Sequence, residues 1–290
     1  MRRIIIFFLF IFSLWTIGHY GLWTIEAAPS KNSIQIKGSD TMVNLAQAWA
    51  EAFMQRNPGK IIAVTGGGSG TGFASLINQT CDIAMTSRSI KQKEIQLAQA
   101  KNVNPKEIKV ALDGLAVVIN PKNKINKLTI DQLADIFTGK ITNWNQFSGD
   151  NLKIVILSRE VNSGTHVYFK EHVLSRPSQK GSEEFSPSAL LLPSSQAIAD
   201  EVAQNPAAIG YYGMGYISPR QKPVHIAVSG ALNFIEPTLK TVTTGEYPIS
   251  RPLFLYTNGE PKGLVREFLD FVLSPEGQAV VTKIDFVPIK

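Results

Sequence analysis

Short apolar runs alternate with segments of helical spacing along the chain from Lys31 onward. The apolar runs predict strands over residues 33–37, 60–65, 81–85, 110–120, 152–157, 208–212 and 252–256. The intervening segments predict helices over residues 43–55, 73–78, 91–101, 129–137, 167–174, 195–204, 264–273 and 275–282. This alternation is typical of an α/β protein. The run VALDGLAVVIN at 110–120 is long enough to predict a strand that crosses between two lobes.

The N-terminus carries the pattern of an export signal. Met1-Arg2-Arg3 gives a positive start, a long apolar stretch follows, and Ala27 and Ala28 form a small-residue exit. We therefore predict that residues 1–28 are a signal peptide, which places the protein in the periplasm or at the outer face of the cytoplasmic membrane. The alternative is a retained anchor formed by residues 4–25, because roughly 20 apolar residues span a bilayer.

Composition indicates a globular chain without a nucleic-acid partner. Of its 290 residues 44% are hydrophobic and 18% are charged, and the net charge is +6. The basic residues are scattered singly, which favours a solvated basic surface over a nucleic-acid interface. Cys81 is the single cysteine, so no internal disulfide forms, and we expect it to be a buried small apolar residue. The four histidines show no metal-ligand spacing, and no metal site is predicted.

Three short polar motifs share one predicted position, after a strand and at the start of a helix. They are Gly38-Ser39-Asp40-Thr41, Gly68-Ser69-Gly70-Thr71 and Asn162-Ser163-Gly164-Thr165. Each taken alone is an ordinary helix cap, worth about 1 kcal/mol. Three in one chain indicate an anion site, because helix N-termini offer unpaired N–H donors and glycine lets an anion approach the backbone.

Two arginines stand at the ends of predicted strands near these motifs. Arg159 precedes Ser163 by four residues, and Arg88 follows the strand at 81–85. A guanidinium there suits a tetrahedral oxyanion through forked hydrogen bonds. A surface salt bridge is the equally weighted alternative for either arginine alone.

Catalytic patterns are missing from the glycine-rich loop Gly66–Gly72. No Lys-Ser or Lys-Thr follows it, so it is not a phosphate loop of the nucleotide-hydrolase type. Thr71 breaks both the dinucleotide-binding and the nucleophile-elbow patterns. His166 has no carboxylate placed by the sequence to orient it. A binding protein is therefore predicted, and not an enzyme.

With these residues assembled, the chain resembles the periplasmic phosphate-binding proteins of bacterial ABC phosphate importers. The resemblance runs from about Ile34 to Phe286 and rests on segments in the same order: IKGSDTMVNL, VTGGGSGTGFASL, IFTGKITNW, LSREVNSGTHVYF and SPEGQAVV. It implies a type II two-lobed α/β binding protein, each lobe a mixed sheet flanked by helices, with the ligand in the inter-lobe cleft. The lobes would be residues 30–113 plus 248–290, and residues 114–247.

The resemblance also implies a function and a site. The chain would bind inorganic phosphate, without a cofactor, and deliver it as a monomer to a membrane-embedded ABC permease. The implied phosphate-binding residues are Ser39, Asp40, Thr41, Ser69, Gly70, Arg88, Arg159, Ser163, Gly164 and Thr165. Two positions depart from the family pattern: Arg88 stands where some members carry an aspartate, and Asn162 stands where a glycine is usual.

Asp40 is the candidate that would separate phosphate from sulfate. Phosphate at neutral pH carries a proton that a carboxylate accepts, whereas sulfate carries none and would leave the carboxylate unsatisfied. The alternatives are a binding protein for sulfate or another tetrahedral oxyanion, a secreted phosphatase-like enzyme, and a sensor or adhesion protein on the same fold.

Overall fold

The computed structural model describes residues 32–175 and 183–289. The predicted signal peptide lies outside these ranges. Within them, no helix combines the length and the apolar character needed to cross a membrane.

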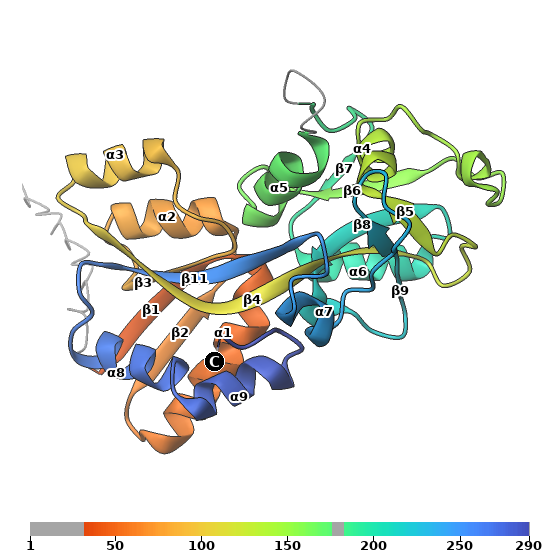
Figure 1. The fold of residues 1–290 in the computed structure, drawn as a ribbon. Helices are drawn as coiled ribbons and strands as arrows, with labels where there is room; N and C mark the ends of the chain where they lie inside the picture. Colours follow the sequence, from red (N-terminus) through yellow and green to blue (C-terminus); the bar gives the residue numbers. More distant parts are fainter. Residues whose placement is uncertain (1–31, 176–182, 290) are drawn as a thin grey trace, which may run out of the picture. The chain divides into compact units, whose positions relative to one another are not determined.

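The first lobe is a twisted sheet with helices on both faces. Its strands lie in the order β2-β1-β3-β11-β4, with β1 parallel to β2 and β3, and with β11 antiparallel to β3 and β4. In Figure 1, α2 and α3 cover one face, and α1, α8 and α9 cover the other. The strands are β1 (Ser33–Gly38), β2 (Ile61–Thr65), β3 (Ile83–Thr86), β4 (Pro105–Ile119) and β11 (Ser250–Asn258). The helices are η1 (Asp40–Met42), α1 (Val43–Arg56), α2 (Ser69–Ile77), α3 (Gln92–Ala100), α8 (Gly263–Val272) and α9 (Pro275–Lys283).

The second lobe continues the same sheet. From β4 the order runs β8-β6-β7, with β9 also paired to β4, and β5 and β10 form a separate parallel pair. The strands are β5 (Lys127–Thr129), β6 (Val155–Arg159), β7 (Leu190–Leu192), β8 (Ala208–Gly213), β9 (Lys222–Pro223) and β10 (His225–Ala227). The helices are α4 (Ile130–Phe137), η2 (Trp144–Phe147), α5 (Gly164–Phe169), η3 (Lys170–Leu174), α6 (Ser195–Gln204), η4 (Met214–Tyr216) and α7 (Leu239–Thr243).

Strand β4 belongs to both lobes. Its first part, from Pro105 to Gly114, pairs with β11, and its second part, from Leu115 to Ile119, pairs with β8. The long yellow and blue strands of Figure 1 show this crossing. The sequence prediction of one long crossing strand is thereby confirmed.

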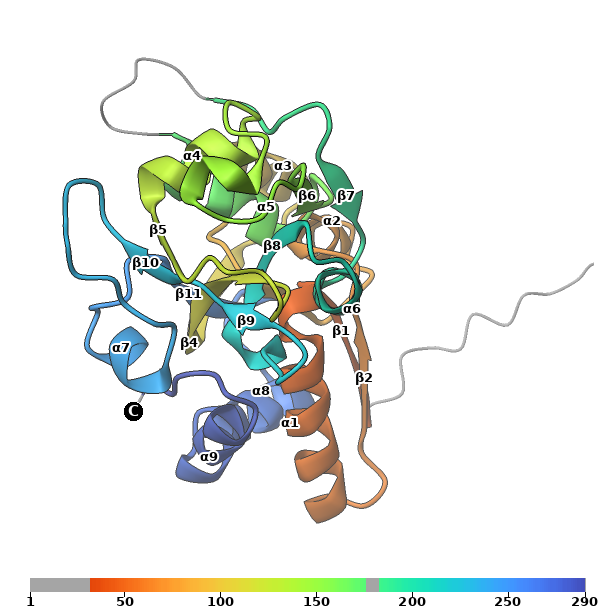
Figure 2. The same cartoon turned by 90° about the vertical axis from the view of Figure 1, so that its right-hand side faces the viewer.

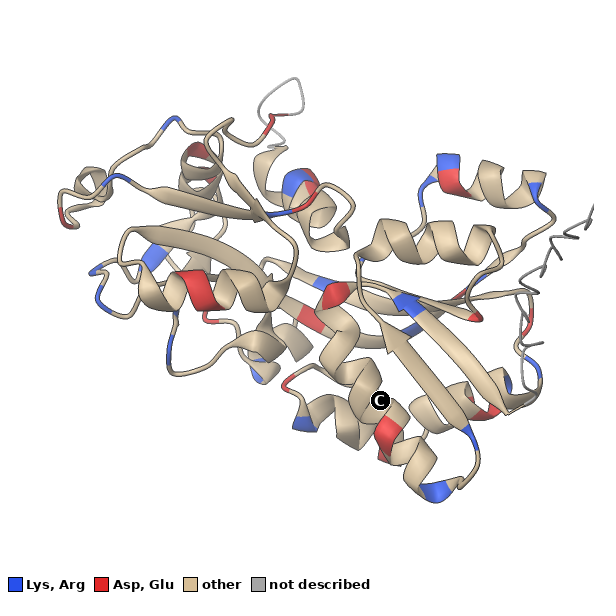
Figure 3. Cartoon of the chain, turned by 180° about the vertical axis from the view of Figure 1, so that it is seen from behind, with Lys and Arg blue, Asp and Glu red and all other residues tan. Residues whose placement is uncertain are grey.

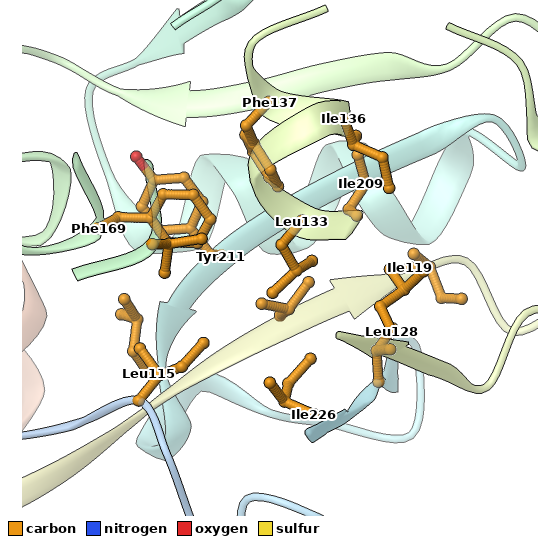
Figure 4. Packing of buried hydrophobic residues seen from close by; sticks show 14 of the residues in the cluster. Leu115, Ile119, Leu128, Leu133, Ile136, Phe137, Phe169, Ile209, Tyr211 and Ile226 are labelled. Carbon is orange, nitrogen blue, oxygen red and sulfur yellow. The ribbon is translucent and has the colours of Figure 1, made fainter. Parts of the chain in front are cut away.

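Buried apolar side chains gather in separate cores on the two sides of this crossing. One large core joins α1, α8 and α9 to the sheet of the first lobe, and Figure 2 shows these three helices together. Another joins α4, α5 and the inner face of β4 and β8, and includes Phe137, Phe169 and Tyr211 (Figure 4). The rings of Phe169 and Tyr211 stack with centroids 3.9 Å apart. Each lobe therefore has its own packed interior.

For single elements, the sequence predicted the type, helix or strand, better than it predicted the first and last residues. Strand β6 runs from Val155 to Arg159 instead of 152–157, and the helix predicted at 167–174 is α5 followed by the π-helical turn η3. Cys81 is only half-buried and precedes β3, so the prediction of a buried residue was wrong. Burial still raises the pKa of its thiol to about 12. In the view of Figure 3 the basic and acidic residues are interspersed along the ribbon.

Candidate functional site

The three polar motifs converge where the two lobes meet. Thr41 follows β1 in the first lobe and Thr165 follows β6 in the second, and their Oγ1 atoms are 2.8 Å apart. Both side chains are buried, as are Ser39, Ser69 and Ser163. Segments separated by more than a hundred residues thus place hydroxyl groups around one point. We call the buried hydroxyl residues Ser39, Thr41, Ser69, Ser87, Ser163 and Thr165 the cradle.

Ser69 and Gly164 approach each other closely across the two lobes. A Cβ atom on Gly164 would lie 2.3 Å from Ser69 Oγ and 2.6 Å from Ser87 Oγ, so a larger residue there would force both serine hydroxyls to move. The Ser87 N–H donates to Ser69 Oγ at 3.0 Å, and the two hydroxyl oxygens are 3.3 Å apart. The sequence motifs did not predict Ser87, although it stands beside Arg88, which they did indicate.

Helix capping explains only one of the three motifs. Ser163 is the N-cap of α5, and its Oγ accepts the Thr165 N–H at 3.2 Å. Ser39 makes no side-chain capping hydrogen bond, and Ser69 lies inside the first turn of α2. The hydroxyls of the first lobe are therefore not placed for capping, which favours a role toward a ligand.

Asp40 and Arg159 form an ion pair between the lobes. Asp40 Oδ2 lies 3.2 Å from Arg159 Nη1 and accepts the Ser195 N–H at 2.7 Å. The Tyr216 hydroxyl donates to the Asp40 carbonyl at 2.9 Å. Arg159 is buried and also donates to Ser195 Oγ and Pro193 O, at 3.0 and 2.8 Å. Burial lowers the pKa of Arg159 and the adjacent Asp40 opposes this shift, so the guanidinium stays charged.

The glycine loop closes on Asn162 of the second lobe. The Gly70 N–H, expected to face the ligand, donates instead to the Asn162 carbonyl at 2.9 Å. The Asn162 side chain donates to Gly67 O at 2.9 Å. At Gly68, where φ is +93°, a Cβ atom would lie 2.9 Å from the Asn162 carbonyl oxygen. The loop glycines thus allow the two lobes to touch through their backbones.

Arg88 does not join the cradle. Its Nη1 and Nη2 donate to the two carboxylate oxygens of Glu94 at 2.8 and 2.7 Å, and its guanidinium lies 4.8 Å from the centre of the Phe73 ring. The salt-bridge alternative describes these contacts. The pairing is internal to the first lobe.

A further arginine, Arg251, reaches the site from β11. Its Nη2 donates to Thr165 Oγ1 at 2.9 Å and lies 3.5 Å from Thr41 Oγ1. Its Nε and Nη2 both donate to Asp113 Oδ2, at 3.1 and 2.9 Å, from the facing position on β4. Burial raises the pKa of Asp113, and Arg251 opposes this shift. Arg251 Nη1 is buried without a hydrogen-bond partner.

Sequence reasoning missed Arg251 and Asp113, although a signal was present. Asp113 lies within the strand predicted at 110–120 and Arg251 directly precedes the strand predicted at 252–256, and buried charges of opposite sign require each other. Together with the hydroxyls, the two guanidiniums provide hydrogen-bond donors of the kind that bind a tetrahedral oxyanion. Among residues 32–175 and 183–289, no group of three or more metal-ligating side chains gathers.

Comparison with known proteins identifies the family. A family model described as a PBP superfamily domain matches residues 25–276. The phosphate-binding protein PstS of Bacillus subtilis is 34% identical over 263 residues, which cover 90% of this chain and 82% of that protein. The chain belongs to the PstS family of phosphate-binding proteins. The PstS protein of Pseudomonas aeruginosa is 32% identical over 281 residues, covering 91% of this chain and 85% of that protein.

A solved structure shares both the family and the two-lobed fold. It is a protein of Clostridium perfringens described as a phosphate ABC transporter substrate-binding protein, with bound phosphate. The two chains superpose with a TM-score of 0.79 at 33% identity, covering 89% of this chain and all of the other. The expected type II binding-protein architecture is thereby confirmed.

Proposed function

We propose that this chain binds inorganic phosphate outside the cytoplasmic membrane and delivers it to an ABC permease. The observation that carries the proposal is the meeting of Thr41, Ser69 and Thr165 beside the buried guanidinium of Arg251. Hydroxyls from both lobes contact one another there, so a small oxyanion between them would be held from both sides. The names of the relatives agree with this ligand.

The proposed ligand set is the cradle together with the ion pair beside it. It comprises Ser39, Asp40, Thr41, Ser69, Gly70, Arg159, Ser163, Gly164 and Thr165, with Ser87 and Arg251 added. Gly70 would take its part only after its N–H exchanges Asn162 for the ligand. Arg88 is left out of the proposed set, because its guanidinium is paired with Glu94. The lobes are proposed to be residues 30–113 plus 248–290, and residues 114–247, which agrees with the separate cores.

We further propose that the protein is monomeric and has no catalytic activity. His166, the candidate base considered from the sequence, lies with Nδ1 3.3 Å from the Ser158 hydroxyl and with its ring centre 4.5 Å from that of Phe185. Burial lowers the pKa of His166. Its neighbours are a hydroxyl and an aromatic ring, and this setting supports a packing role. Cleavage after the export signal, in preference to anchoring by residues 4–25, completes the proposal.

Isothermal titration of the purified exported domain with phosphate, arsenate and sulfate tests the ligand. We expect saturable binding of phosphate and arsenate at one site and much weaker binding of sulfate. Thr165→Val should lower phosphate affinity by about tenfold or more, because it removes one buried hydrogen bond to an anion. Thr243→Val, at an exposed position on α7, is the matched control and should bind like the wild type.

Two outcomes would overturn the proposal. One is binding of sulfate in preference to phosphate, which would assign the other oxyanion. The other is steady release of phosphate from a phosphomonoester by the purified chain, which would make it a phosphatase-like enzyme. Gel filtration with light scattering reports the oligomeric state.

A further inference from the structure

Arg251 is a buried cation with one nitrogen that no hydrogen bond satisfies. Its Nε and Nη2 donate to Asp113, and Nη2 also donates to Thr165 of the second lobe. Its Nη1 has no hydrogen-bond partner, although the side chain is only 1% exposed. A buried donor without a partner destabilises the form that buries it, unless another group compensates.

The aromatic ring of Tyr168 supplies such a compensation. The Arg251 guanidinium carbon lies 5.5 Å from the centre of this ring. An arginine within about 6 Å of a ring centre is attracted by the negative charge of the ring face, and the attraction is stronger where water is excluded. Because the ring face attracts the delocalised charge and not one particular N–H, it stabilises a guanidinium whose Nη1 no acceptor reaches.

Tyr168 and Thr165 reach Arg251 from the same helix, α5. They are three residues apart, a spacing that makes two side chains neighbours on a helix surface. Helix α5 belongs to the second lobe, whereas Arg251 lies on β11 in the sheet of the first lobe. Closure of the lobes therefore brings a hydroxyl and an aromatic ring onto one guanidinium together, and opening withdraws both.

Two contacts fix the ring of Tyr168 in this place. Its hydroxyl donates to Ser250 O at 2.6 Å, and Ser250 pairs with Gly114, the last pair before β4 changes its partner from β11 to β8. The ring of His172 stacks on it with centroids 3.8 Å apart, and His172 Nδ1 donates to the Tyr168 carbonyl at 3.0 Å. The ring is thus held both from its own helix and from the point where the strands cross between the lobes.

We propose that Tyr168 is a positioning residue for phosphate binding: it clamps the Arg251 guanidinium when the lobes close and so keeps Nη2 on the hydroxyl of Thr165. The proposal rests on the proposed function, because it takes Arg251 and Thr165 to be part of the phosphate site. Tyr168 acts through Arg251 and need not touch the anion. Since the clamp is complete only in the closed form, its loss speeds phosphate release and leaves association unchanged.

Phosphate titration and release kinetics of three variants test the clamp. Tyr168→Leu removes the ring, and we expect phosphate affinity to fall by about tenfold, with an equal rise in the dissociation rate. Tyr168→Phe keeps the ring and loses the hydrogen bond to Ser250, so a loss of about threefold is expected.

Tyr212→Phe is the matched control, because Tyr212 is also a buried tyrosine of the second lobe and its hydroxyl has no partner to lose. It should bind like the wild type. Misfolding of a variant would lower the number of sites per chain, whereas loss of the clamp lowers the affinity of every site. Wild-type affinity in Tyr168→Leu would overturn the proposal.

A double-variant cycle tests whether Tyr168 acts through Arg251. In an Arg251→Met background the cation is gone, so adding Tyr168→Leu should change phosphate affinity by less than about twofold. A tenfold further loss in that background would show that Tyr168 acts independently of Arg251, and the proposal would be wrong. No phosphate binding by the wild type would refute the proposed function, and the role of Tyr168 with it.

Discussion

Two arginine–aspartate pairs lie where the lobes meet, one fully buried and one with a partly exposed aspartate, and they are built differently. Arg251 and Asp113 face each other on the paired strands β11 and β4. Arg159 and Asp40 come from different lobes: Arg159 is the last residue of β6, and Asp40 follows β1. The backbone hydrogen bonds between β11 and β4 hold Arg251 and Asp113 opposite each other. The Arg159–Asp40 pair exists only while the lobes are together.

The difference separates two tasks that a closing cleft must perform. A guanidinium held by Asp113 within one sheet is oriented before any ligand arrives, so no ordering is needed at binding. A guanidinium that meets Asp40 across the cleft stabilises the closed form, and hinge closure around ligand is a common switching mode. Both pairs neutralise their arginine, so the ligand is held largely by directed hydrogen bonds.

Breaking the Arg251–Asp113 pair should have the largest effect on both stability and phosphate affinity. Arg251→Met leaves Asp113 buried without its counter-charge, which costs about 3–5 kcal/mol of unfolding free energy. Phosphate affinity should fall by about a hundredfold or more, because the donor to Thr165 is lost as well. Urea unfolding and calorimetry measure the two effects. The double variant Arg251→Met/Asp113→Asn should recover part of the stability but not the affinity.

The single variant Arg251→Met should also change how the free energy of unfolding depends on pH. Burial already raises the folded-state pKa of Asp113 above 3.8, and loss of Arg251 raises it further. Because the folded state then binds the proton more tightly, stability is greatest below the unfolded pKa and falls as pH rises through the folded pKa. Urea midpoints of Arg251→Met should decline from about pH 4 upward more steeply than in the wild type. A parallel pH profile would contradict the assigned role of the pair.

Breaking the Arg159–Asp40 pair should lower phosphate affinity less, and it tests the selectivity for phosphate over sulfate. Asp40→Asn still accepts the Ser195 N–H but loses the charge beside Arg159. We expect phosphate affinity to fall by about tenfold, with a narrower gap between phosphate and sulfate, if Asp40 accepts the proton of phosphate. Titration with both anions measures the gap. An equal loss of affinity for phosphate and sulfate would mean that Asp40 links the two lobes but does not select phosphate.

A smaller change at another contact between the lobes, from Asn162 to the glycine loop, tests how much the ion pair contributes to closure. Asn162→Ala removes the hydrogen bond to Gly67 O and keeps the one from the Gly70 N–H to the Asn162 carbonyl. Phosphate affinity should fall by about two- to fivefold, the effect of one exposed hydrogen bond, with no change in urea stability. A loss as large as that of Asp40→Asn would show that the Asn162 side chain, and not the ion pair, governs closure.

The smallest effect is expected at His166, which belongs to neither pair. Burial lowers its folded-state pKa, so the unfolded chain binds the proton first as pH falls below about 6.5. The stability contributed by neutral His166 is present above that value and is lost toward lower pH. His166→Phe should flatten the profile in that range with phosphate affinity unchanged. A profile identical to the wild type would remove His166 from the acid response.

The sequence predicted the fold class because the alternation of elements and the motif order are local signals. It predicted the long strand β4 because the nearly continuous apolar run at 110–120 is typical of a buried strand. The short strands β5, β9 and β10 have two or three residues each and owe their existence to pairing partners far away. Local pattern carries no record of such pairing.

The cradle was predicted in part for a similar reason. Ser39, Ser69 and Ser163 stand next to glycines at strand ends, where a sequence motif is visible. Ser87 and Arg251 reach the same place through tertiary packing alone. Arg88 was selected for its charge, and only the structure reveals Glu94 as its partner.

The position of β11 in the sheet constrains the order in which this chain can fold. The strand lies between β3 and β4 in the first lobe, yet it comes from residues 250–258. The first lobe therefore lacks an internal strand until nearly the whole polypeptide is available. Long-range pairing of this kind is slow, because a large loop loses conformational entropy on closing before the stabilising contacts form. A growing chain therefore has no complete first lobe until residues 250–258 have been made.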